Sequence, residues 1–166
     1  MGGLGHILSR LRREDRGAAL VEFGVVLPLL VLFLGLSIEA ARTFWSYQAT
    51  VAGVRDATRY MGRSVQTGIC DSGPGDISGW TAVVTDMVRN TEDGETLFPA
   101  SITVNSVTPT LACITGQGFR MVETPMVTVS AELEITYPFA SLFSFVGVSL
   151  PTVRTVVTDT GRIFGA

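Results

Sequence analysis

A long apolar run, residues 17–38 with the sequence GAALVEFGVVLPLLVLFLGLSI, is the feature that most constrains this chain. Its last 21 residues, from position 18 to 38, include 14 that are Leu, Ile, Val or Phe. As a helix these residues would be about 31 Å long, which matches the hydrocarbon core of a bilayer. The run therefore predicts a single membrane span close to the N-terminus.

A basic leader, residues 1–17, precedes the span. Four arginines against Glu14 and Asp15 give residues 1–16 a balance of +2. Because clustered arginine beside a span stays cytoplasmic, we expect the leader inside and the C-terminal part exported. His6, the only histidine, lies in this leader, and no metal-ligating or catalytic partner is near it in the sequence.

The run is longer than the apolar core of an ordinary secretory signal peptide. No obvious small-residue cleavage site follows Ile38, although Glu39, Ala40 and Ala41 come close to one. A plain signal anchor therefore stays open as an alternative. Pro28 should kink the helix or loosen one turn, which membrane helices tolerate.

Glu22 places a charge inside the apolar run, where a charge is costly and marks a functional position by default. It follows Gly17 by five residues, and Phe23 comes directly after it. A basic leader, then Gly17, four small or apolar residues, Glu22-Phe23 and a long apolar helix resemble a class III signal peptide. Prepilin peptidases cut such peptides on the cytoplasmic side of the membrane.

The sequence segments RGAALVEF and VLPLLVLFLG, around these residues, resemble the TadE-like family, which comprises pseudopilins of the tight-adherence (Flp) pilus system. The resemblance is strongest across residues 12–45. It implies cleavage between Gly17 and Ala18, with the apolar helix retained and Glu22 as residue five of the mature chain.

Such cleavage would expose a positively charged amine at Ala18. Glu22 of a neighbouring helix would then be a partner for that amine within the membrane, where the exclusion of solvent strengthens the attraction. The pair would also fix the axial register between subunits. The simpler alternative is that Glu22 lies at headgroup level and extends its carboxylate into water.

Residues 39–63 continue without a proline, and apolar residues recur close to helical spacing. They are Ala41, Phe44, Trp45, Val51, Val54 and Met61. We expect one continuous helix over about residues 18–62, with a membrane-spanning first half and an amphipathic second half. Trp45 and Tyr47 follow the span closely, as expected for aromatic residues at the membrane interface. The alternative is that they pack under the exported domain, and both can hold at once.

Turn residues make 64–79 loop-like, and Asp71 and Asp76 fit turn chemistry better than a calcium loop. A short helix is predicted over 80–89, capped by Asp76 or Ser78. Its inward residues would be Val83, Val84, Met87 and Val88.

Strands are predicted at 101–107, 125–137 and 152–158, with a possible short one at 118–123. The strand at 125–137 alternates most clearly between apolar and polar residues, which indicates one buried face and one wet face. A second apolar segment, 138–150, is too short to span a membrane. It is core, a membrane-surface patch or a contact with another subunit.

The predicted fold is α+β and pilin-like. A single N-terminal transmembrane helix extends into a long amphipathic helix, which packs on a small antiparallel β-sheet because an apolar sheet face needs a cover. The expected regions are the leader at 1–17, the span at 18–38, the helix extension at 39–63 and an exported α+β domain at 64–166.

Cys70 and Cys113 both follow the span. In an oxidising compartment an even pair of cysteines predicts a disulfide, and two buried free thiols are the alternative.

We find no residue pattern typical of an enzyme, a metal site or a cofactor site. Glu132 and Glu134 lie two apart on the predicted wet face, where solvated charge is expected. Beyond the leader the arginines are scattered singly along a chain of net charge −3, which disfavours nucleic-acid binding.

The leading prediction is a minor pseudopilin-like subunit of a Flp-type pilus, inserted in the inner membrane. Flp-type major pilins are much shorter and have little beyond the helix. The expected partners are a prepilin peptidase, other pilin or pseudopilin subunits, inner-membrane assembly proteins and the membrane itself. The alternative is an uncleaved, single-pass anchored periplasmic module for binding or adhesion.

Overall fold

The structure is a computed structural model that describes residues 15–71, 75–91, 94–115, 123–137, 147 and 152–165. The chain divides into two compact units between Ala40 and Ala41. The leader's residues 1–14, with His6, lie outside the described residues. So do segment 138–150, apart from Gly147, and nearly all of 118–123.

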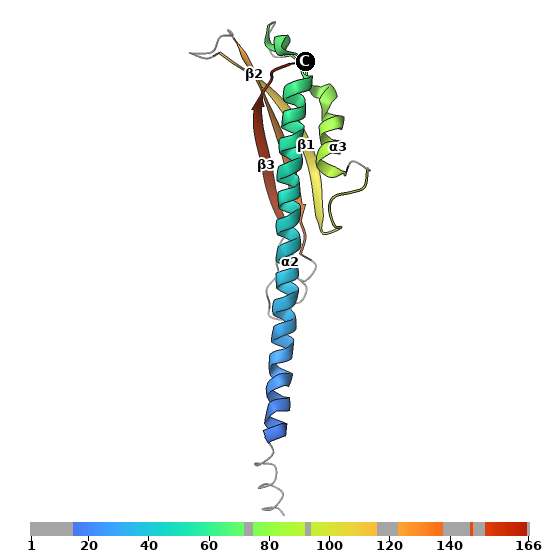
Figure 1. Ribbon diagram of the computed structural model, residues 1–166, viewed down its shortest axis with the longest axis vertical. Helices are drawn as coiled ribbons and strands as arrows, with labels where there is room; N and C mark the ends of the chain where they lie inside the picture. Colours follow the sequence, from blue (N-terminus) through green and yellow to red (C-terminus); the bar gives the residue numbers. More distant parts are fainter. Residues whose placement is uncertain are drawn as a thin grey trace, which may run out of the picture. The chain divides into compact units, whose positions relative to one another are not determined.

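Helix α2, Asp15–Ser64, is 50 residues long and continues through Pro28 (Figure 1). The predicted continuous helix is therefore confirmed, and it is a few residues longer at each end. From Gly17 onward α2 is long and apolar enough to cross a membrane, by length and composition. The loss of one backbone N–H at Pro28 does not end it.

Two short 3-10 turns, η1 (Thr67–Cys70) and η2 (Ser78–Trp80), precede helix α3 (Thr81–Arg89). The carboxylate of Asp76 accepts hydrogen bonds from the backbone N–H and the hydroxyl of Ser78, at 2.8 and 2.9 Å. Asp76 thus stabilises a turn just before η2, and the predicted capping of the helix at 80–89 by Asp76 or Ser78 was wrong, because α3 has no side-chain cap. These hydrogen bonds favour the charged carboxylate and hold the pKa of Asp76 below its ordinary value.

Three strands form an antiparallel sheet in the order β1-β2-β3: β1 is Ile102–Ile114, β2 is Thr124–Ile135 and β3 is Val153–Arg162. The three strands predicted around 101–107, 125–137 and 152–158 are all present, although β1 and β3 end several residues later than expected. In the central strand, Val129 lies opposite Pro109 of β1 and Asp159 of β3.

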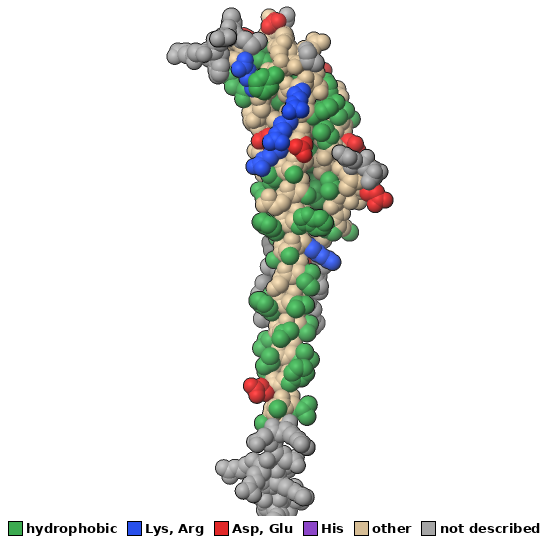
Figure 2. Space-filling model, in the orientation of Figure 1, with side chains coloured by type: hydrophobic (Ala, Val, Ile, Leu, Met, Phe, Trp, Pro, Cys, Tyr) green, Lys and Arg blue, Asp and Glu red, His purple; other side chains and the backbone are tan. Residues whose placement is uncertain are grey.

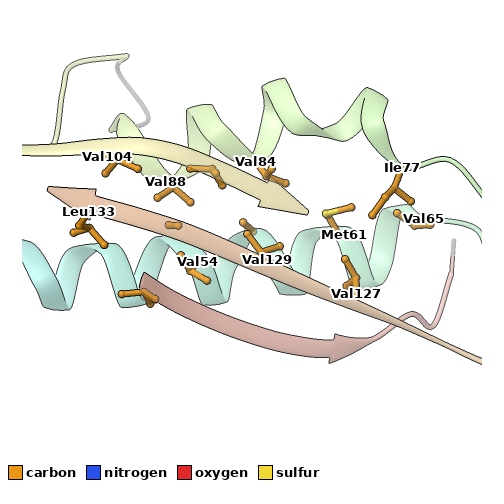
Figure 3. Close-up of a cluster of buried hydrophobic side chains, with 14 of the residues drawn as sticks. Val54, Met61, Val65, Ile77, Val84, Val88, Val104, Val127, Val129 and Leu133 are labelled. Carbon is orange, nitrogen blue, oxygen red and sulfur yellow. The ribbon is translucent and has the colours of Figure 1, made fainter. Parts of the chain in front are cut away.

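The apolar face of β2 forms the middle of the core, as its alternation predicts. Its buried residues are Val127, Val129, Ala131, Leu133 and Ile135. Side chains from the second half of α2 and from α3 pack onto this face, and Figure 3 shows them converging between the helices and the sheet. From α3, Val84 and Val88 are buried, whereas Val83 is exposed.

The buried face of α2 is not the one that the apolar spacing predicts. Met61 and Val54 are fully buried, but Trp45 is 72% exposed and Phe44 is 66% exposed. At about 100° per residue, Trp45 lies about 160° around the helix from Met61, so the six apolar residues never formed one face. Of the two interpretations given for Trp45, its exposed side chain does not support packing under the exported domain.

Hydroxyl residues complete the buried face of α2. Ser46, Thr50 and Thr58 are all buried. The hydroxyl of Thr50 donates to the carbonyl of Ser46 at 3.0 Å, and that of Thr58 donates to the carbonyl of Val54 at 2.9 Å. Because the hydroxyls of Thr50 and Thr58 bond a carbonyl one turn back, the burial of these two threonines leaves neither hydroxyl unsatisfied.

Helix α2 and strand β3 approach closely where two glycines face the partner element. A Cβ on Gly62 would lie 2.9 Å from the carbonyl oxygen of Arg162, and one on Gly161 would lie 2.8 Å from Cγ2 of Thr58. This seam brings the end of β3 onto the last turns of α2.

Candidate processing and assembly site

Gly17 and Ala18, the predicted cleavage position, lie in the first turns of α2 and are exposed. A Cβ at Gly17 would meet nothing within 4 Å. The helix therefore does not itself require glycine here, and a requirement for it would come from outside the fold.

Glu22 lies one turn after Ala18 in α2 and is exposed. Four residues correspond to about 6 Å of helix rise, with both side chains on nearly the same face. Among the described residues, Glu22 belongs to neither of the two ion pairs, Arg59–Asp56 and Arg154–Glu134. The carboxylate is thus available to an amine at Ala18 of its own chain or of a neighbouring one.

Apolar side chains surround Glu22 on α2. Phe23, Val25 and Val26 are 60%, 61% and 47% exposed, and the next two turns are equally open. Figure 2 shows hydrophobic side chains in green along this part of the helix, with one acidic group in red among them. An apolar surface on all sides of a helix suits lipid or other apolar helices, and water does not favour it.

The two cysteines are joined in a disulfide, with their Cα atoms 5.8 Å apart. Cys70 ends η1 and Cys113 lies near the end of β1, so the bond fastens the segment after α2 to the sheet. A carboxylate oxygen of Glu123 lies within 4.8 Å of both sulfurs. Because the sulfurs are bonded to each other, they are not thiolate ligands, and this group is no metal site.

A family comparison bears on the first part of the chain. Residues 17–59 match the family described as TadE-like protein. The match confirms the resemblance inferred from RGAALVEF and VLPLLVLFLG, although it begins at Gly17, leaves the leader outside and extends further along α2. No curated protein and no solved structure matches the chain.

The TadE-like segment, residues 17–59, contains Gly17, Ala18, Glu22 and Phe23 and ends before the sheet. The family is associated with the Tad/Flp pilus system, so the match supports a pilus-associated role in general terms. Among the residues that the structure describes, α2 is the one helix that could cross a membrane, which is consistent with a single-pass membrane anchor.

Sequence reasoning missed a group of arginines in the second unit. It treated the arginines beyond the leader as isolated, yet the structure brings Arg59, Arg63 and Arg162 to the walls of one pocket. The spacing of Arg55, Arg59 and Arg63 at every fourth position was the available signal, because such residues share a helix face. Arg162 carried no signal, since only the fold brings β3 to α2.

Proposed function

We propose that this chain is a minor pseudopilin-like subunit of a Flp/Tad-type pilus. A prepilin peptidase cleaves it after Gly17, and the mature chain, beginning at Ala18, acts in assembling or priming the pilus. The span lies in the inner membrane, the leader in the cytoplasm and the domain at 64–166 in the periplasm. Its role is structural, without catalysis and without a cofactor.

The observation that carries this proposal is the exposed carboxylate of Glu22 within a lipid-type helix surface, inside a TadE-like segment that begins at Gly17. A charge on such a surface is costly unless it has a partner. Cleavage after Gly17 supplies that partner as a positive amine at Ala18. Pairing with the amine of a neighbouring subunit also sets the register between two helices, which a purely apolar contact sets weakly.

The decisive measurement is the N-terminal mass of the protein isolated from membranes of a cell that holds the peptidase. We expect a chain that begins at Ala18. Gly17→Val is the matched control: because nothing in the fold opposes a side chain at Gly17, this variant should insert normally and keep its leader. An intact Met1 start in the wild type, with the peptidase active on another substrate, would exclude the proposal.

A second candidate is an uncleaved, single-pass anchored module for periplasmic binding or adhesion. One observation favours it: the sheet and α3 lie outside the TadE-like segment. The same mass measurement separates the two candidates, because only the second predicts a retained leader.

A further inference from the structure

A pocket of about 320 Å³ opens within the second unit, between the last turns of α2 and the end of β3. Its walls include Arg59 and Arg63 of α2, and Asp159, Thr160 and Arg162 of β3. Phe164, which is 70% exposed, closes one side, and the guanidinium carbon of Arg162 lies 5.7 Å from the centre of its ring. The pocket therefore combines guanidinium groups with an apolar wall.

Three arginines extend the positive charge of the pocket along α2. Arg55, Arg59 and Arg63 are exposed and occur at every fourth residue, which places them along one helix face with about 6 Å of rise between neighbours. Figure 2 shows Lys/Arg side chains in blue as a diagonal stripe over this part of the molecule. We call Arg55, Arg59 and Arg63 the arginine stripe.

The stripe is not uniformly positive. Asp56 lies beside Arg59, and their nearest charged atoms are 3.7 Å apart, in an exposed pair that contributes little. Asp159 adds a carboxylate to the wall of the pocket itself. A ligand must therefore carry negative charge in several places and leave gaps opposite the two aspartates.

We propose that the arginine stripe and its pocket form a docking site for an acidic segment of a protein partner. The partner presents carboxylates about 6 Å apart, as glutamates do at four-residue spacing on a helix, and an apolar side chain that covers Phe164. Guanidinium groups suit this role because they bind carboxylates through two parallel hydrogen bonds. The site is independent of leader cleavage, so the inference goes beyond the proposed function.

Two features favour a protein segment over a phosphate ligand. A phosphate chain or a nucleic acid needs an unbroken positive surface, which Asp56 and Asp159 interrupt. A protein segment places a neutral or donor group opposite each aspartate and an apolar group on Phe164. A wrong partner that places carboxylates opposite Asp56 and Asp159 is repelled by them, so the two aspartates also confer selectivity.

Binding of a labelled peptide to the full-length protein in detergent tests the proposal. The probe is a helical peptide with glutamates at four-residue spacing and a leucine at one end. The control peptide has glutamine in place of each glutamate and keeps the leucine. We expect the glutamate peptide to bind in a salt-sensitive manner and the glutamine peptide to bind at least about tenfold more weakly. R59Q/R63Q should lose about the same factor.

R42Q is the matched control variant, because Arg42 is exposed on α2 but lies about 25 Å along the helix axis from Arg59 and about 31 Å from Arg63. It should bind the glutamate peptide as the wild type does. R59E/R63E should instead bind a peptide with arginine in place of glutamate, which shows that charge pairing acts at this site and that the variant is folded.

Three results would overturn the proposal. The first is that the glutamate peptide does not bind. The second is that the glutamine peptide binds as tightly as the glutamate peptide, or that R59Q/R63Q binds the glutamate peptide as tightly as the wild type does. The third is tighter binding of inorganic phosphate or of a short thymidine oligonucleotide through the same arginines, which would make the site one for phosphates.

Discussion

The backbone N–H of Phe164 donates a hydrogen bond of 2.7 Å to the carbonyl oxygen of Gly62. Gly62 lies in the last turn of α2, where carbonyl groups have no partner within the helix. The segment after β3 therefore supplies a partner that the helix lacks. The same contact places Phe164 and Arg162 beside Arg63, which forms the arginine-lined pocket.

The absence of a side chain at Gly62 should be required for this contact. In Gly62→Val the new Cβ would lie 2.9 Å from the backbone oxygen of Arg162, which cannot rotate away. We expect the free energy of unfolding to fall by about 1–3 kcal/mol. Gly79→Val, where a Cβ meets nothing within 4 Å, is the control for adding the same side chain. Thermal unfolding in detergent measures both, and equal melting temperatures would contradict a close seam between α2 and β3.

The buried face of α2 leads to a second comparison. Met61→Ala removes a side chain that is fully buried and should lower the free energy of unfolding by about 2–5 kcal/mol. Trp45→Ala removes a larger side chain that is 72% exposed, and it should change stability by less than about 0.5 kcal/mol. Denaturant titration followed by near-UV circular dichroism gives both values. A larger loss for Trp45→Ala would instead favour packing of Trp45 under the exported domain.

The contrast between these two residues shows what sequence periodicity captured. Along β2 the alternation was regular over a whole strand, and it predicted the buried side chains from Val127 to Ile135. Along α2 the apolar residues were sparse, and three hydroxyl residues, Ser46, Thr50 and Thr58, lie on the buried face. A threonine such as Thr50 counts as polar in a pattern, yet its hydroxyl is satisfied by the Ser46 carbonyl and it packs like valine.

The two candidate sites also differ in how much of them could be predicted from the sequence. Gly17 and Glu22 are five residues apart, so their relation was visible in the sequence and needed only a helix. The pocket joins Arg59 to Arg162, from opposite ends of the second unit, and no local pattern connects them. Their meeting depends on the packing of β3 against α2, which depends in turn on Gly62 and Gly161.

Reduction of the Cys70–Cys113 disulfide should destabilise the second unit. The bond joins residues 43 apart in the sequence, and closing a loop of that size restricts the unfolded chain. We expect the Cys70→Ser/Cys113→Ser double variant to lose about 2–4 kcal/mol. A non-reducing gel establishes the bond in the wild type, and melting temperatures with and without reductant give its effect. The double variant should be insensitive to reductant, so a further shift there would assign the effect to something other than this bond.

Glu134 should make stability depend on pH in the acidic range. Its carboxylate accepts a hydrogen bond from the side chain of Asn105 and one from Arg154, at 3.0 and 2.9 Å. The Asn105 hydrogen bond is the first cause of a pKa below the ordinary 4.5, and the charge of Arg154 acts in the same direction. A lowered folded-state pKa means that the stabilisation is complete above pH 4.5 and is lost as the pH falls through the folded-state value.

The measurement for Glu134 is the difference in melting temperature between wild type and Glu134→Gln as the pH is lowered. We expect the wild type to be the more stable above pH 4.5 and the difference to shrink below it. Glu132→Gln serves as the control, because Glu132 lies on the same strand and its side chain makes no hydrogen bond or ion pair with the residues that the structure describes. A difference that is constant across this range would contradict the assigned hydrogen bonds.

Glu22→Ala should separate membrane insertion from assembly. Removing a carboxylate from an apolar helix lowers the free-energy cost of membrane insertion. A charged residue at the bilayer centre costs about 2.5–3.5 kcal/mol, and the gain here should be smaller because Glu22 lies near the end of the span. The variant should therefore reach the membrane fraction at least as well as the wild type. Val26→Ala, one turn later on the same helix face, is the matched control and should behave as the wild type in every respect.

Under the proposed function, assembly should respond to Glu22→Ala in the opposite way, because the amine that cleavage would expose at Ala18 then has no carboxylate partner in a neighbouring helix. An apolar helix surface without that pair still allows association, but at several axial registers of similar energy. We expect cells with Glu22→Ala to show few or no pili by electron microscopy, while the variant is inserted and begins at Ala18. Normal piliation with a correctly cleaved variant would refute the register role and leave Glu22 as a charge at the level of the lipid headgroups. An uncleaved variant would instead assign Glu22 a role in recognition by the peptidase.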